Sequence, residues 1–217
     1  MEEKKAFLFD LNGTMVDDMA FHIQAWHTIL NSLGAGISIE RTKAECYGKN
    51  DELLERIFPG RFSPEEKNTM SYDKERQYQA GFRPLLKLIN GLPTFLEKTR
   101  SEGIVMAIGS AAIMFNIDFV LDGLNIRHYF NAIVSADDVQ ESKPHPETYT
   151  RCADLLGVTY RNCIVFEDSP KGVEAAANAG MQSVAITTMH TREEFGGKNI
   201  LFFIDDYTDP QLDRLFR

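Results

Sequence analysis

The chain has 217 residues, enough for one large domain or for a domain that carries a smaller insert. Its 32 acidic and 23 basic side chains give a formal charge of -9, and without a lysine or arginine block this argues against a nucleic-acid partner. A signal peptide and an apolar run of about 20 residues, the length of a membrane span, are both lacking, so we expect no membrane partner and a cytoplasmic monomer. The three cysteines, Cys46, Cys152 and Cys163, are widely spaced, and we expect them to be reduced packing residues.

Short apolar runs that end in polar residues recur along the chain and predict β-strands. They cover residues 6–12, 105–110, 132–137, 163–169 and 183–187. Such continuous runs are typical of strands that are buried on both faces of a parallel sheet. Helical segments follow at 92–103, 115–124, 146–157 and 171–180, and the last two end at glycines. Strand alternating with helix predicts an α/β fold with a doubly wound parallel sheet.

Residues 17–83 interrupt this alternation, because they contain helical patterns and no convincing strand. Four apolar residues have helical spacing at the start of the segment, namely Ile23, Trp26, Leu30 and Leu33. The run DELLERIF at 51–58 predicts a second helix, and Ser63-Pro64-Glu65-Glu66 has the form of a capping box that opens a third. We therefore predict an all-helical cap domain at 17–83, inserted after the first strand of an α/β core that comprises 1–16 and 84–217.

Polar residues follow the first four predicted strands. They are Asp10 and Asn12 after the first, Ser110 after the second, Lys143 after the third, and Glu167 and Asp168 after the fourth. The carboxyl ends of parallel strands form the binding crevice of such sheets, so these groups meet if the first strand is central. Each group alone is compatible with a helix cap or a solvated loop charge. Together they suit phosphoryl transfer, in which a carboxylate reaches an anionic phosphoryl group only if a cation and a lysine neutralise the charge.

Four motifs resemble those of the haloacid dehalogenase superfamily. They are DLNGT at 10–14, GS at 109–110, SKPHP at 142–146 and FEDSPKGVEAA at 166–176. The helical insert is similar to the cap of the β-phosphoglucomutase-like subgroup, and the resemblance covers essentially the whole chain. It implies a Rossmann-like core and a phosphohydrolase activity.

The resemblance also implies roles for individual residues. Asp10, Asn12, Lys143 and Ser110 form the catalytic set, with Asp10 as the nucleophile that becomes an aspartyl-phosphate. Asp10, the main-chain carbonyl of Asn12 and Asp168 hold Mg²⁺, with Glu167 beside them. The implied substrate-binding residues are Gly13, Thr14, His22, Ala111 and Lys49.

Three positions depart from the family pattern. Asn12 stands where the family has an acid/base aspartate, and an amide donates a hydrogen bond but exchanges no proton near neutral pH. Asp51 lies near the place where sugar-phosphate mutases of the family have an arginine. The family also has a hinge lysine, and counting along this sequence places Tyr78 at that position instead. A neutral imidazole at His22 is a candidate replacement base, although a histidine on an amphipathic helix is more often a packing residue.

The sequence therefore leaves more than one function open. The first is a magnesium-dependent phosphatase that acts on a small phosphorylated metabolite. The alternatives are a β-phosphoglucomutase-type mutase, which Asp51 and Asn12 disfavour, and a catalytically impaired protein that binds a phosphorylated ligand without turnover. Relatives that cleave carbon–halogen or carbon–phosphorus bonds also lack the second aspartate, but their other site residues differ from those found in this chain.

Overall fold

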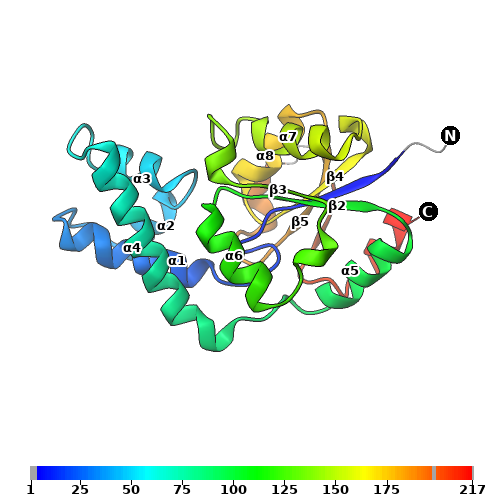
Figure 1. Ribbon diagram of the computed structural model, residues 1–217, viewed down its shortest axis with the longest axis horizontal. Coiled ribbons are helices and arrows are strands. Elements are labelled where there is room, and N and C mark those ends of the chain that lie inside the picture. Colours follow the sequence, from blue (N-terminus) through cyan, green and yellow to red (C-terminus); the bar gives the residue numbers. More distant parts are fainter. Residues whose placement is uncertain (1–3, 197–198, 217) are drawn as a thin grey trace. The chain divides into compact units, whose positions relative to one another are not determined.

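The computed structural model describes residues 4–196 and 199–216. The chain divides into an α/β unit, Met1–Asp17 with Lys87–Arg217, and a helical unit, Asp18–Leu86 (Figure 1). The helical unit extends three residues beyond the predicted limit at 83, because the 3-10 turn Arg83–Leu85 continues directly from the preceding helix.

The α/β unit is built on a parallel sheet of six strands in the order β3-β2-β1-β4-β5-β6. The strands are β1 Ala6–Phe9, β2 Val105–Gly109, β3 Ala132–Val134, β4 Cys163–Glu167, β5 Gln182–Ile186 and β6 Ile200–Ile204. The predicted doubly wound α/β fold is confirmed, and β1 is central because it pairs with both β2 and β4. β6 was not predicted, although its sequence ILFFI is an apolar run of the same kind as the others.

Four α-helices connect the strands of this unit. They are α5 Leu92–Ser101, α6 Met114–Gly123, α7 Glu147–Leu156 and α8 Pro170–Asn178, each within two residues of its predicted bounds. Short 3-10 turns lie at Arg127–Tyr129, Ala136–Asp138, Tyr160–Asn162, Arg192–Phe195 and Pro210–Phe216. Across the described ranges, no helix combines the length and apolarity that crossing a membrane requires.

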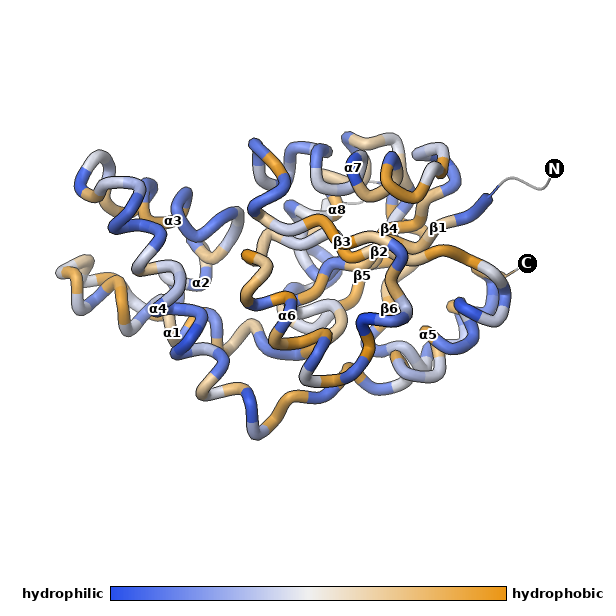
Figure 2. The backbone as a smooth tube through the Cα atoms, in the orientation of Figure 1, coloured by the Kyte–Doolittle hydropathy of each residue, from blue (hydrophilic) through white to orange (hydrophobic). Residues whose placement is uncertain are grey.

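The core of the α/β unit explains why β1 is apolar at every position. Ala6 and Leu8 belong to the hydrophobic cluster that α7 and α8 cover on one face of the sheet. Phe7 and Phe9 alternate with them and therefore face the other side, where Phe7 stacks on Phe95 of α5 at 5.8 Å between ring centroids. All four residues of β1 are fully buried, and the strands form a hydrophobic layer in Figure 2.

The helical unit contains α1 Met19–Ser32, α2 Ile39–Glu45, α3 Asn50–Ile57 and α4 Pro64–Phe82. α2 was not predicted. The predicted capping box of α4 is confirmed, because Ser63 Oγ accepts from the main-chain nitrogen of Glu66 and Glu66 Oε2 accepts from that of Ser63. The apolar cluster of the helical unit joins α1 to α3 and comprises Trp26, Ile29, Leu30, Leu53, Leu54 and Phe58.

The buried face of α4 is mainly polar. Its buried residues are Ser71, Lys74, Glu75, Tyr78, Gln79 and Phe82, which recur at intervals of three and one along the helix. The helix is largely hydrophilic in Figure 2. α4 therefore packs through hydrogen bonds and ion pairs rather than through an apolar stripe, so a search for apolar periodicity does not find its inner face.

Candidate active site

The turn that follows β1 places Asp10 at the carboxyl end of the central strand. The main-chain nitrogen of Asp10 donates to the carbonyl of Phe166 at 3.0 Å, which continues the pairing of β1 with β4. The chain then reverses at Gly13, which has φ of 75° and donates to the carbonyl of Val16 at 2.8 Å. A positive φ favours glycine, so this residue permits the tight turn that carries Asn12.

Three segments that are distant in sequence hold this turn from behind. Thr188 Oγ1 donates to the Gly13 carbonyl at 2.5 Å, and the Tyr207 hydroxyl donates to the Thr14 carbonyl at 3.1 Å. The main-chain nitrogen of Ile89 donates to the Met15 carbonyl at 2.9 Å. The backbone around Asn12 is therefore anchored through groups that sequence reasoning did not find, because no local motif marks Thr188 or Tyr207.

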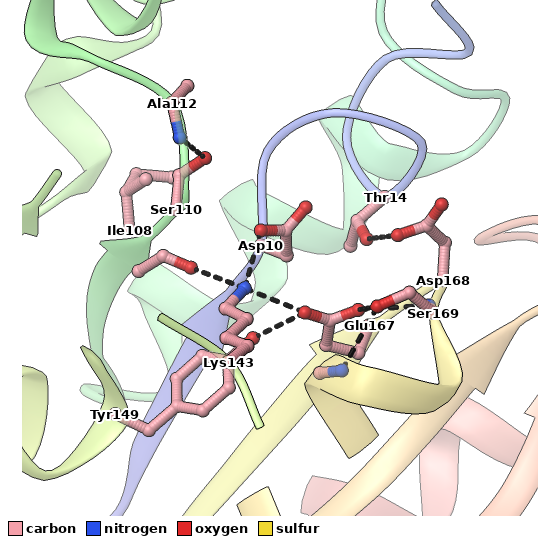
Figure 3. Close-up of polar contacts among 12 residues, drawn as sticks. Asp10, Thr14, Ile108, Ser110, Ala112, Lys143, Tyr149, Glu167, Asp168 and Ser169 are labelled. Carbon is pink, nitrogen blue, oxygen red and sulfur yellow. Dashed lines mark hydrogen bonds and ion pairs between the residues drawn. The ribbon is translucent and has the colours of Figure 1, made fainter. Parts of the chain in front are cut away.

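Lys143 lies at the centre of the site, with only 7% of its surface exposed. Its Nζ donates to Asp10 Oδ1 at 2.7 Å, to Glu167 Oε1 at 2.7 Å and to the Gly109 carbonyl at 3.0 Å (Figure 3). An ammonium has three hydrogens to donate, and here each has an oxygen acceptor. Burial by itself lowers the pKa of this lysine, but the charges of Asp10 and Glu167 outweigh it and raise the pKa above its ordinary value. Lys143 is therefore a fixed positive charge beside Asp10.

Glu167 is held by the protein through both of its carboxylate oxygens. Oε1 accepts from Lys143 and from the Tyr149 hydroxyl at 2.8 Å, and Oε2 accepts from the main-chain nitrogen and the hydroxyl of Ser169, both at 3.0 Å. Burial raises the pKa of Glu167, but the charge and hydrogen bond of Lys143 lower it more, so the group remains a carboxylate. Both carboxylate oxygens of Glu167 therefore have donors in the lysine network, and its predicted place beside the metal ligands stays a prediction.

Gly172 makes room for this carboxylate. A Cβ atom at this position would lie 1.7 Å from Glu167 Oε1, far closer than any real contact. The residue occupies the first turn of α8, where Ser169 Oγ accepts from its main-chain nitrogen at 3.0 Å. Sequence reasoning missed Gly172, and the available signal was a glycine inside a predicted helix, where it is otherwise unfavourable.

Asp168 lies next to this network, at the carboxyl end of β4, and is 4% exposed. Thr14 Oγ1 donates to its Oδ1 at 3.4 Å, so the turn after β1 and the end of β4 are joined (Figure 3). Burial, followed by the negative charges of Asp10 and Asp168, raises the pKa of Tyr207 well above its ordinary value, so both carboxylates act on the same buried ring. Asp10, Glu167 and Asp168 against one ammonium leave a formal surplus of two negative charges.

Oxygen donors of this kind suit a hard divalent cation. Within residues 4–196 and 199–216, no group of three or more His, Cys, Asp or Glu side chains is arranged to hold a metal ion.

Ser110 is buried at the carboxyl end of β2. Its main-chain nitrogen donates to the Val134 carbonyl at 2.9 Å, and its Oγ accepts from the main-chain nitrogen of Ala112 at 3.2 Å. Ala111 follows and is half-buried. Ser110 thus belongs to a local turn between β2 and α6, one residue after the Gly109 carbonyl that Lys143 binds.

The helical unit contains a second buried polar cluster, centred on His22. Its Nδ1 lies 2.6 Å from Lys74 Nζ, its Nε2 lies 3.4 Å from Asp18 Oδ2, and its ring stacks on Tyr78 at 3.8 Å between centroids. With Lys74 as the donor, Nδ1 is the acceptor and the ring proton is on Nε2, toward Asp18. Both ring nitrogens therefore have partners inside this unit, which disfavours His22 as a free base.

Lys74 is a buried lysine of α4, close in sequence to Tyr78. Lys74 precedes Tyr78 by one helical turn, so both lie on the buried face of α4. Lys74 Nζ donates to Glu75 Oε1 at 3.0 Å, and Asn50 Nδ2 donates to the same oxygen at 3.0 Å. Burial raises the pKa of Glu75, but the positive charge of the adjacent Lys74 outweighs burial and lowers the pKa below its ordinary value.

The remaining predicted residues divide between the units. Lys49 precedes α3, and its main-chain nitrogen donates to Glu52 Oε2 at 3.0 Å, while Asp51 is exposed in the first turn of α3. His22 and Lys49 therefore lie in the helical unit, and Gly13, Thr14 and Ala111 lie in the α/β unit.

The chain matches the family model of haloacid dehalogenase-like hydrolases over residues 7–186. It is 35% identical over 196 residues to an uncharacterized protein of Haemophilus influenzae, with 85% of this chain and 92% of the relative covered. It is 29% identical over 186 residues to the fructose-1-phosphate phosphatase YqaB of Escherichia coli, with 85% and 97% covered. The crystal structure of β-phosphoglucomutase from Clostridium difficile matches with a TM-score of 0.85 and 27% identity over 98% of this chain and 97% of the other. The chain therefore belongs to the haloacid dehalogenase-like hydrolase family, and within it to the β-phosphoglucomutase-like subgroup.

Proposed function

We propose that this protein is a magnesium-dependent phosphatase of small phosphorylated metabolites that uses Asp10 as its nucleophile. The observation that carries the proposal is the contact of Lys143 Nζ with Asp10 Oδ1 at 2.7 Å and with Glu167 Oε1 at 2.7 Å. This arrangement holds a carboxylate at the end of the central strand beside a permanent positive charge. The names of relatives such as fructose-1-phosphate phosphatase and hexitol phosphatase B support the substrate class.

The side chains have separate tasks in the proposed reaction. Asp10 attacks phosphorus and becomes an aspartyl-phosphate as the P–O bond to the substrate alcohol breaks, and the leaving oxygen takes its proton from solvent. Water then cleaves the aspartyl-phosphate, which releases inorganic phosphate and restores the Asp10 carboxylate. The ammonium of Lys143 offsets the charge that collects around the nucleophile. The Ser110 hydroxyl accepts from Ala112 and so retains its own hydrogen, which is available for a phosphoryl oxygen. Glu167 fixes Lys143 and makes no direct contact with the reacting atoms.

The donor set at the ends of β1 and β4 fits a magnesium ion. Asp10, Asp168 and the main-chain carbonyl of Asn12 would hold it, because all three supply oxygen and the surrounding formal charge is negative. When bound, the ion would neutralise part of the negative charge on the phosphoryl oxygens. Thr14 orients Asp168 through its hydroxyl, and Thr188 and Tyr207 fix the carbonyl-bearing turn.

Asn12 makes the proposed phosphatase unusual in its proton transfers. The amide keeps the size of the family's aspartate and its main-chain carbonyl, but it delivers no proton to a leaving group and takes none from water. Loss of general acid-base help typically costs about 10² to 10⁴ in rate. We therefore expect substrates with good leaving groups to react fastest and the Asp10 phosphoryl intermediate to accumulate.

The helical unit is proposed to act as a cap that excludes water from the site, as lids do in other enzymes. His22 and Lys49 remain predicted substrate-binding residues of this unit. Asp51 carries a negative charge that would repel the distal phosphate of a bisphosphate, which disfavours the mutase reaction.

The test is a screen of phosphorylated sugars, hexitol phosphates and p-nitrophenyl phosphate at saturating Mg²⁺, with wild-type, Asn12→Asp and Asp10→Asn protein. The wild type should hydrolyse p-nitrophenyl phosphate, and Asn12→Asp should hydrolyse ester substrates about 10² to 10⁴ times faster than the wild type. Asp10→Asn should be inactive on every compound. Wild-type activity in Asp10→Asn would contradict the assignment of Asp10 as the nucleophile. An Asn12→Asp protein that is no faster on any substrate would contradict the proposal that Asn12 removes general acid-base catalysis.

Two further arms separate the alternatives. β-Glucose 1-phosphate with a bisphosphate primer should yield little glucose 6-phosphate, whereas conversion at about 10⁴ M⁻¹s⁻¹ or more would make the protein a mutase. A stoichiometric burst of product without later turnover would identify a catalytically impaired binding protein.

A further inference from the structure

We propose that Tyr149 is a positioning residue for the nucleophile, because its hydroxyl and its ring together hold Glu167 and Lys143 in the arrangement that presents Lys143 to Asp10. The inference rests on the proposed role of Asp10. Tyr149 comes from α7 and lies outside the motifs that follow the strands.

The hydroxyl of Tyr149 fixes one oxygen of Glu167. It donates to Oε1 at 2.8 Å, and the same oxygen accepts from Lys143 at 2.7 Å. Tyr149 is fully buried and Glu167 is 1% exposed, so water does not compete for these bonds. Burial, followed by the charges of Glu167 and Asp10, raises the pKa of Tyr149 well above its ordinary value, which keeps the hydroxyl a neutral donor.

The ring of Tyr149 forms one wall of the space that Lys143 occupies. Lys143 Nζ lies 4.7 Å from the ring centroid, within the range of a cation–π contact. The ring also abuts Gly109, where an added Cβ would lie 3.1 Å from Tyr149 Cε1. The carbonyl of that glycine is the third acceptor of the ammonium, so the ring touches both Lys143 and the strand end that helps to bind it.

The opposite side of Glu167 is closed by α8. Ser169 binds Oε2 through two hydrogen bonds, and Gly172 leaves no space between its backbone and the carboxylate. On the side of Oε1, the carboxylate is therefore held by two donors, Tyr149 and Lys143. Without the hydroxyl, Oε1 would keep the hydrogen bond from Lys143 and lose the one from Tyr149, and we expect the ammonium to move toward Glu167 and away from Asp10.

The test compares Tyr149→Phe with Tyr160→Phe. Tyr160 is a matched control, because its hydroxyl also donates to a carboxylate, that of Asp154 at 3.0 Å, on the exposed surface of the same unit. Tyr149→Phe should lower kcat for p-nitrophenyl phosphate about tenfold, the effect of one hydrogen bond to a charged group, with KM changed less than about threefold. Tyr160→Phe should match the wild type. In a Glu167→Gln background, Tyr149→Phe should cost less than about threefold, because both changes act through the same contact.

A crystal structure of Tyr149→Phe decides the question independently of activity. The distance from Lys143 Nζ to Asp10 Oδ1, 2.7 Å in the wild type, should exceed the hydrogen-bond limit of about 3.5 Å. An unchanged distance overturns the inference whatever the rate, and a longer distance with an unchanged rate overturns the role in positioning the nucleophile. A wild type that hydrolyses no phosphate ester would defeat the proposed function, and this distance would still test the contact.

Discussion

Lys143 in the α/β unit and Lys74 in the helical unit are both buried beside carboxylates, with 7% and 3% of their surfaces exposed. Lys143 binds Asp10 and Glu167, which lie 133 and 24 residues away, whereas Lys74 binds the adjacent Glu75 and the ring of His22 on a neighbouring helix. The first contact set is assembled at strand ends, and the second lies between two helices.

The two clusters also differ in how their carboxylates are satisfied. In the helical unit, neutral donors bind one oxygen of each carboxylate, because the Tyr78 hydroxyl donates to Asp18 Oδ2 at 2.5 Å and Asn50 Nδ2 donates to Glu75 Oε1 at 3.0 Å, while the buried Glu75 Oε2 has no hydrogen-bond partner among the described residues. In the α/β unit, Asp10 and Asp168 add negative charge at a strand edge where ligands bind in such folds. The comparison teaches that burial of a lysine does not by itself identify an active site. The site around Lys143 differs from the cluster around Lys74 because it has additional carboxylates at the carboxyl end of the sheet. Substitutions in the two clusters should therefore have different effects.

The largest expected effect separates Lys143→Met from Lys74→Met. Loss of the Lys143 charge leaves Asp10 and Glu167 without their cation, so kcat for p-nitrophenyl phosphate should fall about 10³-fold or more. Lys74→Met breaks a buried pair and should lower the free energy of unfolding by about 3 kcal/mol, with a loss of kcat below about tenfold. Steady-state kinetics and urea unfolding followed by circular dichroism measure both. Equal losses of kcat would show that the two lysines do not differ as proposed.

Gly172→Ala should come next, with Gly81→Ala as the matched control in the helical unit. The new Cβ at position 172 would collide with Glu167, so we expect kcat to fall about 10²-fold as Lys143 loses its alignment. At Gly81, in α4, the Cβ would meet Phe21 Cδ1 at an ordinary 3.4 Å, and helix propensity predicts a stabilisation of up to about 1 kcal/mol. Wild-type kcat in Gly172→Ala would mean that Glu167 tolerates displacement.

His22→Gln tests whether the helical cluster takes part in proton transfer. Because both ring nitrogens have partners inside the unit, we expect kcat to fall less than about tenfold while the free energy of unfolding falls by about 2 kcal/mol. A general base would instead cost about 10² or more in kcat without a comparable loss of stability. Comparison of the pH–rate profiles of the two proteins completes the measurement.

The smallest expected effect concerns acid stability and Glu75. Its pKa is lowered in the folded protein, so its carboxylate stabilises the fold above the pKa of the unfolded chain, about 4.3, and this stabilisation is lost as the pH falls through the folded value. Glu75→Gln should therefore lose less stability than the wild type between about pH 5 and pH 3. Urea titrations at each pH measure the slope. A steeper slope for Glu75→Gln would contradict the assignment of Glu75 as a stabilising anion.

Sequence patterns predicted most of the α/β fold because its strands bury both faces. An apolar run such as that of β1 and a polar residue directly after it mark both the strand and the site residue that it carries, as Asp10 shows. The five predicted strands belong to one sheet, in which β1 is central. β6 had the same signal and was overlooked, while α2, with the sequence IERTKAE, has too little apolar periodicity to be recognised.

The inner face of α4 was not predicted for a different reason. Lys74, Glu75 and Gln79 repeat at helical spacing, but hydrophobic periodicity detects only apolar stripes. Their burial is favourable only because α1 and α3 bring His22 and Asn50 to meet them. The polar stripe therefore becomes recognisable only after the helices are packed.

The sequence by itself determined the strand ends, and with them Asp10, Ser110 and Asp168, because residues that terminate adjacent parallel strands must share one edge of a sheet. Lys143 lies in the loop between β3 and α7, and its contact with Asp10 brings it to the same edge. It also determined the Asn12 substitution and hence the chemical question of proton transfer. Only the tertiary structure decided what surrounds these groups. Tyr149 and Gly172 reach Glu167 from two different helices, and Thr188 and Tyr207 bind the Asp10 turn from far along the chain. A hydrogen bond depends on the positions of two atoms in space, and no spacing along the chain specifies those positions.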